Sequence, residues 1–296
     1  MSTIPPQPSG QFLSGFLYAA AAAFFWSLIG PFTKGCLAFG VTAMETAIWR
    51  ALLGGLCFAG QTALAGGLRI PLRHAALFFF FGVLSIGVLF SCFQLGIHLS
   101  GAAMTMVLLY TAPAWVAIFS WFFFHEVISR RKLLAIAIAL AGVTLVCFSG
   151  GSLPGSLSVP GIICGLLSGI AFASQLPFYV WWKTRYPAST IYTYMLLGGT
   201  VAMLPFTDFA PDKPWDVWLN LLALGVVTNY LAYVALAMSL QRISQVHTAV
   251  IGNLEPVLGT LWVWMFFGEN FIPTGWLGSC LVMSAVFLLT SKGKEF

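Results

Sequence analysis

Residues 105–126 have the sequence TMVLLYTAPAWVAIFSWFFFHE, and residues 248–269 have the sequence TAVIGNLEPVLGTLWVWMFFGE. The two stretches align without a gap, from Thr105 against Thr248 to Glu126 against Glu269. Chance supplies some apolar matches, but it does not readily supply a proline, a tryptophan and a glutamate in register. The chain therefore contains an internal repeat, which determines how the whole fold is assembled.

Both stretches are apolar for about 20 residues, the length that a helix needs to cross a bilayer. Of the 296 residues, 59% are hydrophobic and 7% are charged, whereas a soluble domain carries roughly 25% charged residues. A chain with so little charge cannot cover a surface that faces water. Lipid must face this surface, and continuous rather than alternating apolar runs favour helices over a membrane barrel.

The apolar runs predict an all-α integral membrane protein with ten transmembrane helices. Their approximate ranges are 12–37, 42–64, 75–97, 102–124, 132–149, 159–182, 190–207, 217–239, 247–267 and 273–291. We expect the boundaries of such helices to be uncertain by a few residues, because the ends of apolar runs are weaker signals than their centres.

The repeat extends beyond the two opening stretches, with small changes of offset. Leu52-Leu-Gly-Gly55 matches Leu196-Leu-Gly-Gly199, and Pro31-Phe32 matches Pro177-Phe178. This predicts two repeats of five helices each, at 11–149 and 159–291. The remaining segments are predicted as a disordered cytoplasmic tail at 1–10, a linker at 150–158 and a cytoplasmic tail at 292–296.

The basic residues are distributed very unevenly between the connections. One set of connections, together with the C-terminus, contains Arg69, Arg73, Arg130, Arg131, Lys132, Lys183, Arg185, Arg242, Lys292 and Lys294. The opposite set contains Lys213, and Lys34 lies near the same boundary. The positive-inside rule then places both termini in the cytoplasm. It also explains the net charge of +5 without a nucleic-acid partner, because the basic residues lie in short loops.

Five spans are an odd number, so the second repeat must cross the membrane in the opposite direction from the first. Inverted repeats give a protein two related conformations, each open to one side. They also place the substrate site near the midplane, where the halves meet. The predicted organisation therefore points to a carrier for a small solute.

No enzyme or cofactor motif is present in the sequence. There is no HExxH, GxSxG or Walker A sequence, and the six cysteines are scattered without CxxC spacing. We therefore expect no metal, no cofactor and no catalytic activity. An integral-membrane enzyme remains the alternative from another functional class.

Glu255 is the most informative polar residue, because it lies near the middle of the ninth span and immediately precedes Pro256. The proline removes a backbone hydrogen bond and can kink the helix. Ionisable groups at this depth usually face a cavity or a partner. Glu255 therefore either meets an ammonium group or carries a proton, or it is a structural acid that joins the ninth helix to its neighbours.

Three other charged residues lie in the first two spans. Lys34 and Glu45 are near the outer ends of these helices, and a snorkelling ion pair between them is favoured over a gate. Arg50 lies deeper, and its position in the sequence places it about 140° around the helix from Glu45. Arg50 must therefore find another partner, and a substrate carboxylate is one hypothesis.

Polar and aromatic residues form stripes on several predicted helices. The stripe on the third span passes through Phe90 and Gln94, and the same stripe on the eighth span carries their repeat mates. The predicted lining residues are Trp26, Gln94, Tyr110, Gln175, Tyr179, Asn229, Tyr233, Asn253 and Glu255. Such a chamber would have aromatic walls and few hydrogen-bonding groups. The alternative is that these side chains pack helices together.

The repeat unit resembles the EamA module of the drug/metabolite transporter superfamily. The matching residues are Trp26-Ser27, Lys34, Arg50, Tyr110-Thr-Ala-Pro113, His125-Glu126, Asn253-Leu-Glu-Pro256 and Gly268-Glu269. The resemblance implies a central cavity surrounded by the first, third, fourth, sixth, eighth and ninth spans. Within the superfamily the chain looks most like bacterial inner-membrane exporters of neutral and aromatic amino acids. One departure is that Ala112 occupies the position of Glu255 in the first repeat.

The sequence thus predicts a bacterial inner-membrane transporter that exports amino acids or related small metabolites by alternating access. Its expected partners are this small-molecule substrate and the lipid bilayer. The alternative within the same class is efflux of cationic drugs, with Glu255 and tryptophans holding the cation.

Overall fold

The computed structural model describes residues 9–149, 158–267 and 273–290. Ser9 and Gly10, which the sequence placed in the N-terminal tail, are helical. Ser158, which the sequence placed in the linker, caps a helix by accepting a hydrogen bond from the Gly161 backbone NH at 3.1 Å. The rest of the predicted tails and linker, and Glu269, lie outside the described residues.

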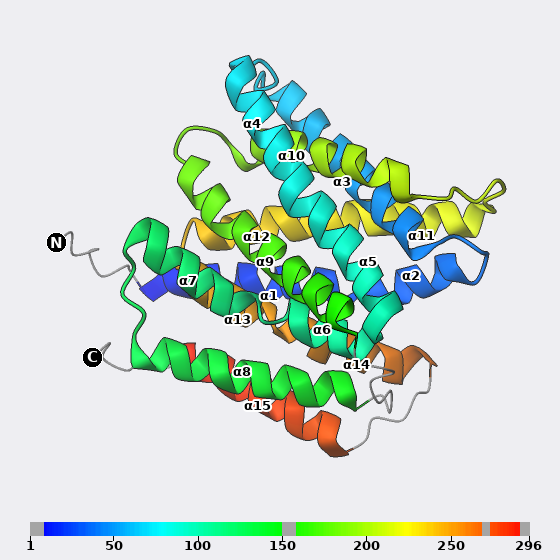
Figure 1. Ribbon diagram of the computed structural model, residues 1–296. Helices are drawn as coiled ribbons and strands as arrows, with labels where there is room; N and C mark the ends of the chain where they lie inside the picture. The colour runs from blue at the N-terminus through cyan, green and yellow to red at the C-terminus, as the bar shows by residue number, and fades with distance from the viewer. Residues whose placement is uncertain (1–8, 150–157, 268–272, 291–296) are drawn as a thin grey trace.

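The described chain is built from helices, shown in Figure 1. The first half contains α1 (Ser9–Ser27), α2 (Ile29–Leu37), α3 (Ala43–Leu64), α4 (Leu72–Gly82), η1 (Val83–Gly87), α5 (Val88–Ser100), α6 (Ala102–Leu109), α7 (Ala112–Phe124) and α8 (Arg130–Phe148). The second half contains α9 (Val159–Trp182), α10 (Ala188–Met203), η2 (Leu204–Phe206), α11 (Trp215–Gly225), η3 (Val226–Leu231), α12 (Ala232–Leu240), α13 (Gln245–Gly252), α14 (Leu254–Phe267) and α15 (Pro273–Thr290).

Seven helical segments in the described chain are long and apolar enough to cross a membrane. They are Gly10–Leu37, Leu72–Ser100, Ala102–Phe124, Arg130–Phe148, Val159–Trp182, Trp215–Leu240 and Pro273–Thr290. The protein is therefore a multi-pass membrane protein. Among the other predicted spans, α10 has only 16 residues, and the ninth is interrupted between α13 and α14. Ten spans stay a prediction.

The internal repeat recurs in the irregularities of the helices. The π-helical turns η1 and η3 begin at Val83 and Val226, which the repeat alignment places opposite each other. The helix break between α6 and α7 at Tyr110 has its counterpart at Asn253, which is the aligned position in the second half. Both breaks lie just before a proline, which cannot donate the backbone hydrogen bond that would continue the preceding turn.

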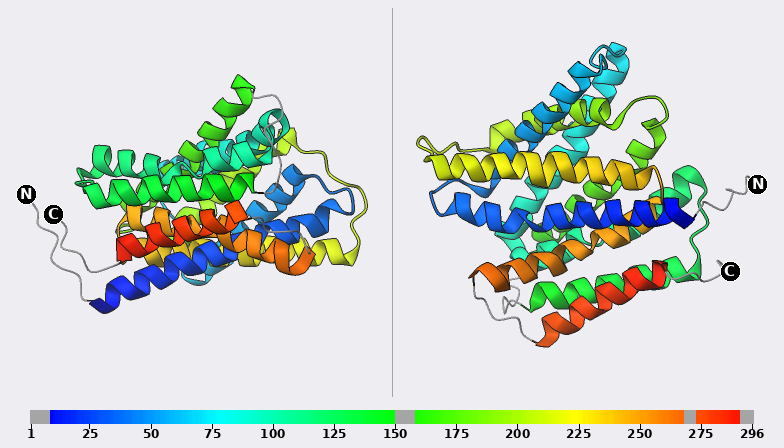
Figure 2. Two further views of the ribbon diagram at one scale, coloured as in Figure 1. Left: turned by 90° about the horizontal axis from the view of Figure 1, so that it is seen from below. Right: turned by 180° about the vertical axis from the view of Figure 1, so that it is seen from behind.

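Contacts between the halves come in matched pairs. Helix α5 packs on α9, and its repeat mate α12 packs on α1. Helix α4 packs on α10, and its mate α11 packs on α3. The mates α8 and α15 lie side by side along one edge of the bundle (Figures 1 and 2). Here a Cβ added at Gly142 would lie 2.7 Å from the Gly278 carbonyl oxygen, so small residues allow the backbones to touch.

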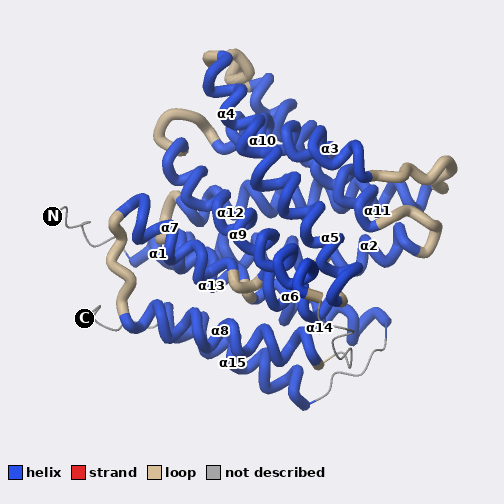
Figure 3. The backbone as a smooth tube through the Cα atoms, in the orientation of Figure 1, coloured by secondary structure: helices blue, strands red, loops and turns tan. Residues whose placement is uncertain are grey.

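Helix α1 begins and helix α15 ends at the same end of the bundle, which we call the termini end (Figure 1). The α7–α8 and α9–α10 loops also lie toward it. The α2–α3 loop and the long α10–α11 connection lie at the opposite end, which we call the far end (Figure 3). The α9–α10 loop contains Lys183 and Arg185, and the α7–α8 loop leads into Arg130, Arg131 and Lys132 at the start of α8.

Candidate functional site

A cavity of about 650 Å³ lies between the two halves. Helices of both halves line it: α1, α2, α3, α5, α6, α7 and α8 from the first half, and α9, α11, α12, α13 and α14 from the second. Residues close to the far end, such as Leu37 of α2 and Trp264 of α14, belong to its wall. The cavity therefore extends from the middle of the bundle to the far end.

Three buried tyrosines form what we call the tyrosine layer: Tyr233 lies in the cavity wall, and Tyr179 and Tyr192 are buried behind it. Their exposed fractions are 2% or less. The rings of Tyr179 and Tyr192 are stacked with centroids 5.7 Å apart, and those of Tyr192 and Tyr233 are 4.8 Å apart. The Tyr233 hydroxyl donates to Gln175 Oε1 at 2.9 Å, and Gln241 Nε2 donates to the Tyr179 hydroxyl at 3.1 Å.

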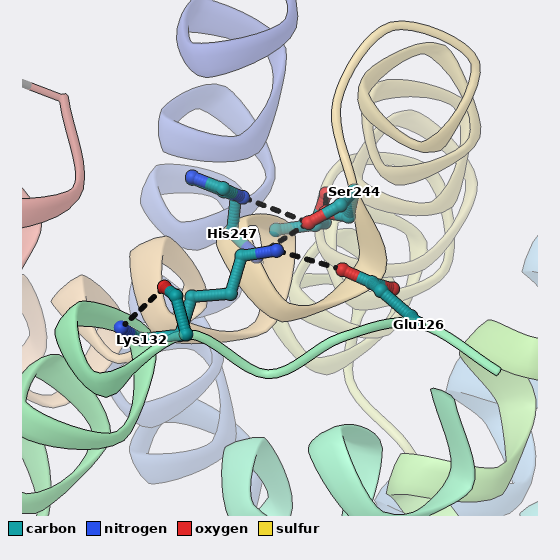
Figure 4. A network of polar contacts seen from close by, with 6 residues as sticks. Glu126, Lys132, Ser244 and His247 are labelled. Atoms are coloured by element: carbon teal, nitrogen blue, oxygen red, sulfur yellow. Dashed lines mark hydrogen bonds and ion pairs between the residues drawn. The ribbon is translucent and has the colours of Figure 1, made fainter. Parts of the chain in front are cut away.

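Two further polar pairs lie near the starts of α8 and α13. Figure 4 shows Glu126 and Lys132, whose carboxylate and ammonium are 2.9 Å apart, facing Ser244 and His247 at the start of α13. The Ser244 hydroxyl and His247 Nδ1 are 2.7 Å apart. One pair belongs to the first half and the other to the second, and the two lie near each other in Figure 4.

The cavity brings together most of the residues that the sequence proposed for the site. Trp26, Gln94, Tyr110, Tyr233, Asn253 and Glu255 line it, as do Lys34 and Arg50. These side chains come from many different helices and helix junctions, which is why no short motif in the sequence gathers them.

Gln175, Tyr179 and Asn229 are not among the residues of the cavity wall. They are buried behind it, with exposed fractions of 0%, 1% and 0%. Gln175 Nε2 donates to the Ser85 carbonyl oxygen at 3.4 Å, and Asn229 Nδ2 donates to the Arg50 carbonyl oxygen at 3.0 Å. In this structure the side-chain amides of Gln175 and Asn229 connect neighbouring helices. This is the packing alternative that the sequence left open.

The expected ion pair between Lys34 and Glu45 is replaced by a different one. Glu45 is fully buried and pairs with Lys213 Nζ at 2.7 Å. Its carboxylate also accepts hydrogen bonds from Trp49 Nε1 at 3.2 Å and from the Ala210 backbone NH at 2.9 Å. Glu45 thus fastens the α10–α11 connection to α3 at the far end.

Glu255 lies in the first turn of α14, directly after the break at Asn253. The positive end of the helix dipole favours an acid at this position. Its carboxylate interacts with the Tyr110 hydroxyl and with the charge of Arg50 across the cavity. The site thus contains an acid from the second half and a cation from the first.

Phe172 is a wall residue that the sequence analysis missed. Its ring meets Trp26 edge to face, with centroids 5.6 Å apart. Phe172 precedes Gln175 and Tyr179 at helical spacing, so it shares their helix face. The helical spacing could have identified Phe172, but the candidate residues on this helix were chosen for their polar groups, and phenylalanine has none.

Comparisons with known proteins agree with this architecture. A family model described as the EamA-like transporter family matches residues 13–148 and again residues 159–291. The uncharacterized transporter YdfC of Bacillus subtilis is 26% identical over 240 residues, which cover 79% of this chain and 77% of YdfC. The pseudopaline exporter CntI of Pseudomonas aeruginosa is 26% identical over 286 residues, covering 95% and 98% of the two chains.

A solved crystal structure aligns with a TM-score of 0.80 over 96% of this chain and 97% of its own, at 18% sequence identity. At this identity the likeness concerns the fold alone. The family model, in contrast, matches both halves and so nearly the whole described chain. The chain belongs to the EamA-like transporter family.

Proposed function

We propose that the protein is a secondary carrier that exports amino acids or related small metabolites across the bacterial inner membrane. Ten spans in two inverted repeats would move the solute by alternating access through the central cavity. The distribution of basic residues supports cytoplasmic termini, so the far end would face outward.

The observation that supports this proposal is a cavity lined by helices of both halves, whose described wall residues reach toward the far end. A channel would need a continuous path, and the packing of the Tyr179, Tyr192 and Tyr233 rings beside the cavity supports a carrier instead. Matched contacts between the halves allow a second conformation in which the two ends exchange roles. A site of about 650 Å³ with aromatic walls is large enough for a metabolite of amino-acid size.

The test is flux in proteoliposomes that contain the purified protein in a verified orientation. Labelled neutral and aromatic amino acids are compared with a cationic dye of the kind that drug carriers expel, with and without a pH gradient. Saturable flux of amino acids supports the proposal, and its response to the gradient shows whether protons drive it. Flux of the dye without flux of any amino acid would replace amino-acid export by cationic drug efflux.

A further inference from the structure

Arg50 is held at the cavity wall by an unusually close approach of helices. A Cβ added at Gly54 would lie 2.3 Å from Asn229 Nδ2, and one added at Gly225 would lie 2.3 Å from Leu53 Cβ. Asn229 also donates its hydrogen bond to the Arg50 carbonyl oxygen. The backbone of α3 at Arg50 is thereby fixed against η3. This restricts the positions that the Arg50 guanidinium can reach.

The guanidinium of Arg50 lacks the partners that a buried cation normally has. The residue is 9% exposed, and its Nε is buried with no hydrogen-bond partner among residues 9–149, 158–267 and 273–290. Its charge lies over the Phe90 ring, 5.1 Å from the centroid. A ring face compensates a cation only weakly, and an arginine fork is shaped to bind a carboxylate with two parallel hydrogen bonds.

Glu255 does not supply this carboxylate. Although it interacts with the charge of Arg50, no ion pair closer than 4.0 Å joins the two residues in the described chain. The nearby Asn253 Nδ2 is a second buried donor without a partner among the described residues. The cavity wall thus presents a cation, an unused donor and, separated from the cation, an acid.

We propose that Arg50 binds the carboxylate of the substrate while Glu255 binds its ammonium, so that the carrier selects zwitterions bearing both groups. This inference rests on the proposed function and names its substrate class. Each charge of the zwitterion is then neutralised by the opposite charge of one residue in the cavity wall. An amine without a carboxylate would leave Arg50 uncompensated, and a carboxylate without an amine would leave Glu255 uncompensated, both at high cost in a low-dielectric site.

The first test uses compounds that differ only in their charged groups. Phenylalanine is compared with phenylalaninamide, phenethylamine and hydrocinnamate, and alanine with alaninamide, ethylamine and propionate, by binding to the purified protein. We expect the analogues to bind at least roughly 30-fold more weakly than the parent amino acid, the effect of losing one partner of a buried charge pair. Equal binding of an amide or amine would overturn the proposal.

The second test changes the protein. Arg50→Met removes the cation and should shift preference from the amino acid toward the amide and amine, while Glu255→Gln should shift it toward the carboxylates. Arg50→Lys, which keeps the charge but not the fork, should bind the amino acid with intermediate affinity. Arg242→Met is the matched control, because Arg242 also lies over an aromatic ring, that of Tyr18 at 4.8 Å, but is not part of the cavity wall.

A purely structural role for Arg50 makes a different prediction. Arg50→Met would then lower the melting temperature and weaken the binding of all compounds alike, and the zwitterion proposal would be wrong. We expect instead an unchanged or higher melting temperature, because an uncompensated buried charge destabilises the fold. Flux of some other solute, with no binding of either amino acid, would overturn this inference and leave the carrier function standing. No flux of any solute would contradict both the zwitterion inference and the proposed carrier function.

Discussion

Matching positions of the two halves, at and behind the cavity wall, differ in their chemistry. In the second half, Tyr233 meets Tyr192 in the tyrosine layer. The repeat mates of Tyr233 and Tyr192 in the first half are Phe90 and Ile48. Phe90 lies in the wall of the cavity, as Tyr233 does, whereas Ile48 is buried outside it.

The difference is that the second half has hydroxyl groups at these two positions and the first half has none, although the Tyr192 hydroxyl has no hydrogen-bond partner among the described residues. Tyr233 donates to Gln175, whereas Phe90 and Ile48 cannot donate. The same fold position therefore provides a hydrogen-bonding ring in the second half and an apolar ring in the first. We infer that the conformation closed at the termini end is favoured when no substrate is bound.

The largest effect is expected at the far end, from Glu45→Gln. Its side chain and that of Lys213 are 0% and 8% exposed, so the substitution leaves a buried ammonium without its counter-charge. Loss of one partner of a buried pair costs roughly 3 to 5 kcal/mol, and we expect about 3 kcal/mol because the Lys213 ammonium keeps its hydrogen bond to the Ala210 carbonyl oxygen. Denaturant unfolding in detergent measures the change.

The seam between α8 and α15 gives the next effect. Gly142→Ala would place a Cβ against the Gly278 carbonyl oxygen and should lower the free energy of unfolding by about 1 to 3 kcal/mol through overpacking. Gly60→Ala is the control, since no atom lies within 4 Å of its added Cβ. Equal stability of the two variants would show that the halves do not touch here as described.

A smaller effect is expected from Tyr233→Phe, which makes the second half resemble the first. The substitution leaves Gln175 Oε1 without its donor, which destabilises the conformation closed at the termini end by about 1 kcal/mol. The equilibrium between closed and open conformations should therefore shift roughly fivefold toward the open one. Labelling from that end of a cysteine introduced at Ala249, in a cysteine-free background, measures the shift. Tyr194→Phe is the control, because Tyr194 donates to the Leu68 carbonyl oxygen outside the layer; an equal increase in labelling there would contradict the role of the layer.

The smallest effect should come from Glu126→Gln at the termini end. Glu126 and Lys132 are 20% and 10% exposed, and partly exposed ion pairs contribute about 1 kcal/mol or less. The same unfolding measurement as for Glu45→Gln therefore compares the two ends directly. Similar losses in both variants would mean that burial does not distinguish the two ion pairs.

The fold could be predicted from the sequence wherever the repeat carried the signal. The alignment that sets Pro113 against Pro256 also relates the two helix breaks and the two π-helical turns. The apolar runs indicated membrane helices, and seven of the described segments qualify. Three predicted spans are not among them: α3, whose 22 residues include Glu45 and Arg50, α10, which has 16 residues, and the ninth span of α13 and α14. The helix break does not set the ninth span apart, because the fourth span has the matching break and qualifies.

The site could be predicted only in part. Helical periodicity placed Gln94 and Gln175 on inward faces, but it cannot say whether an inward side chain meets a cavity or another helix. For Glu45, proximity in sequence suggested Lys34, whereas the observed partner is Lys213, which belongs to the other half of the chain. Contacts between halves depend on how the helices pack, and a single sequence does not record that directly.

The matched contacts between the halves have a consequence for the protein's ancestry. A five-helix unit with these surfaces would be able to pair with a second copy of itself, and each seam described above would then form twice. Such a pair would have to carry every charged side chain in duplicate. In one chain the two copies can differ, and here Arg50 has Tyr194 as its mate and Glu255 has Ala112. One acid and one cation can then share a single chamber, which two identical subunits could not arrange.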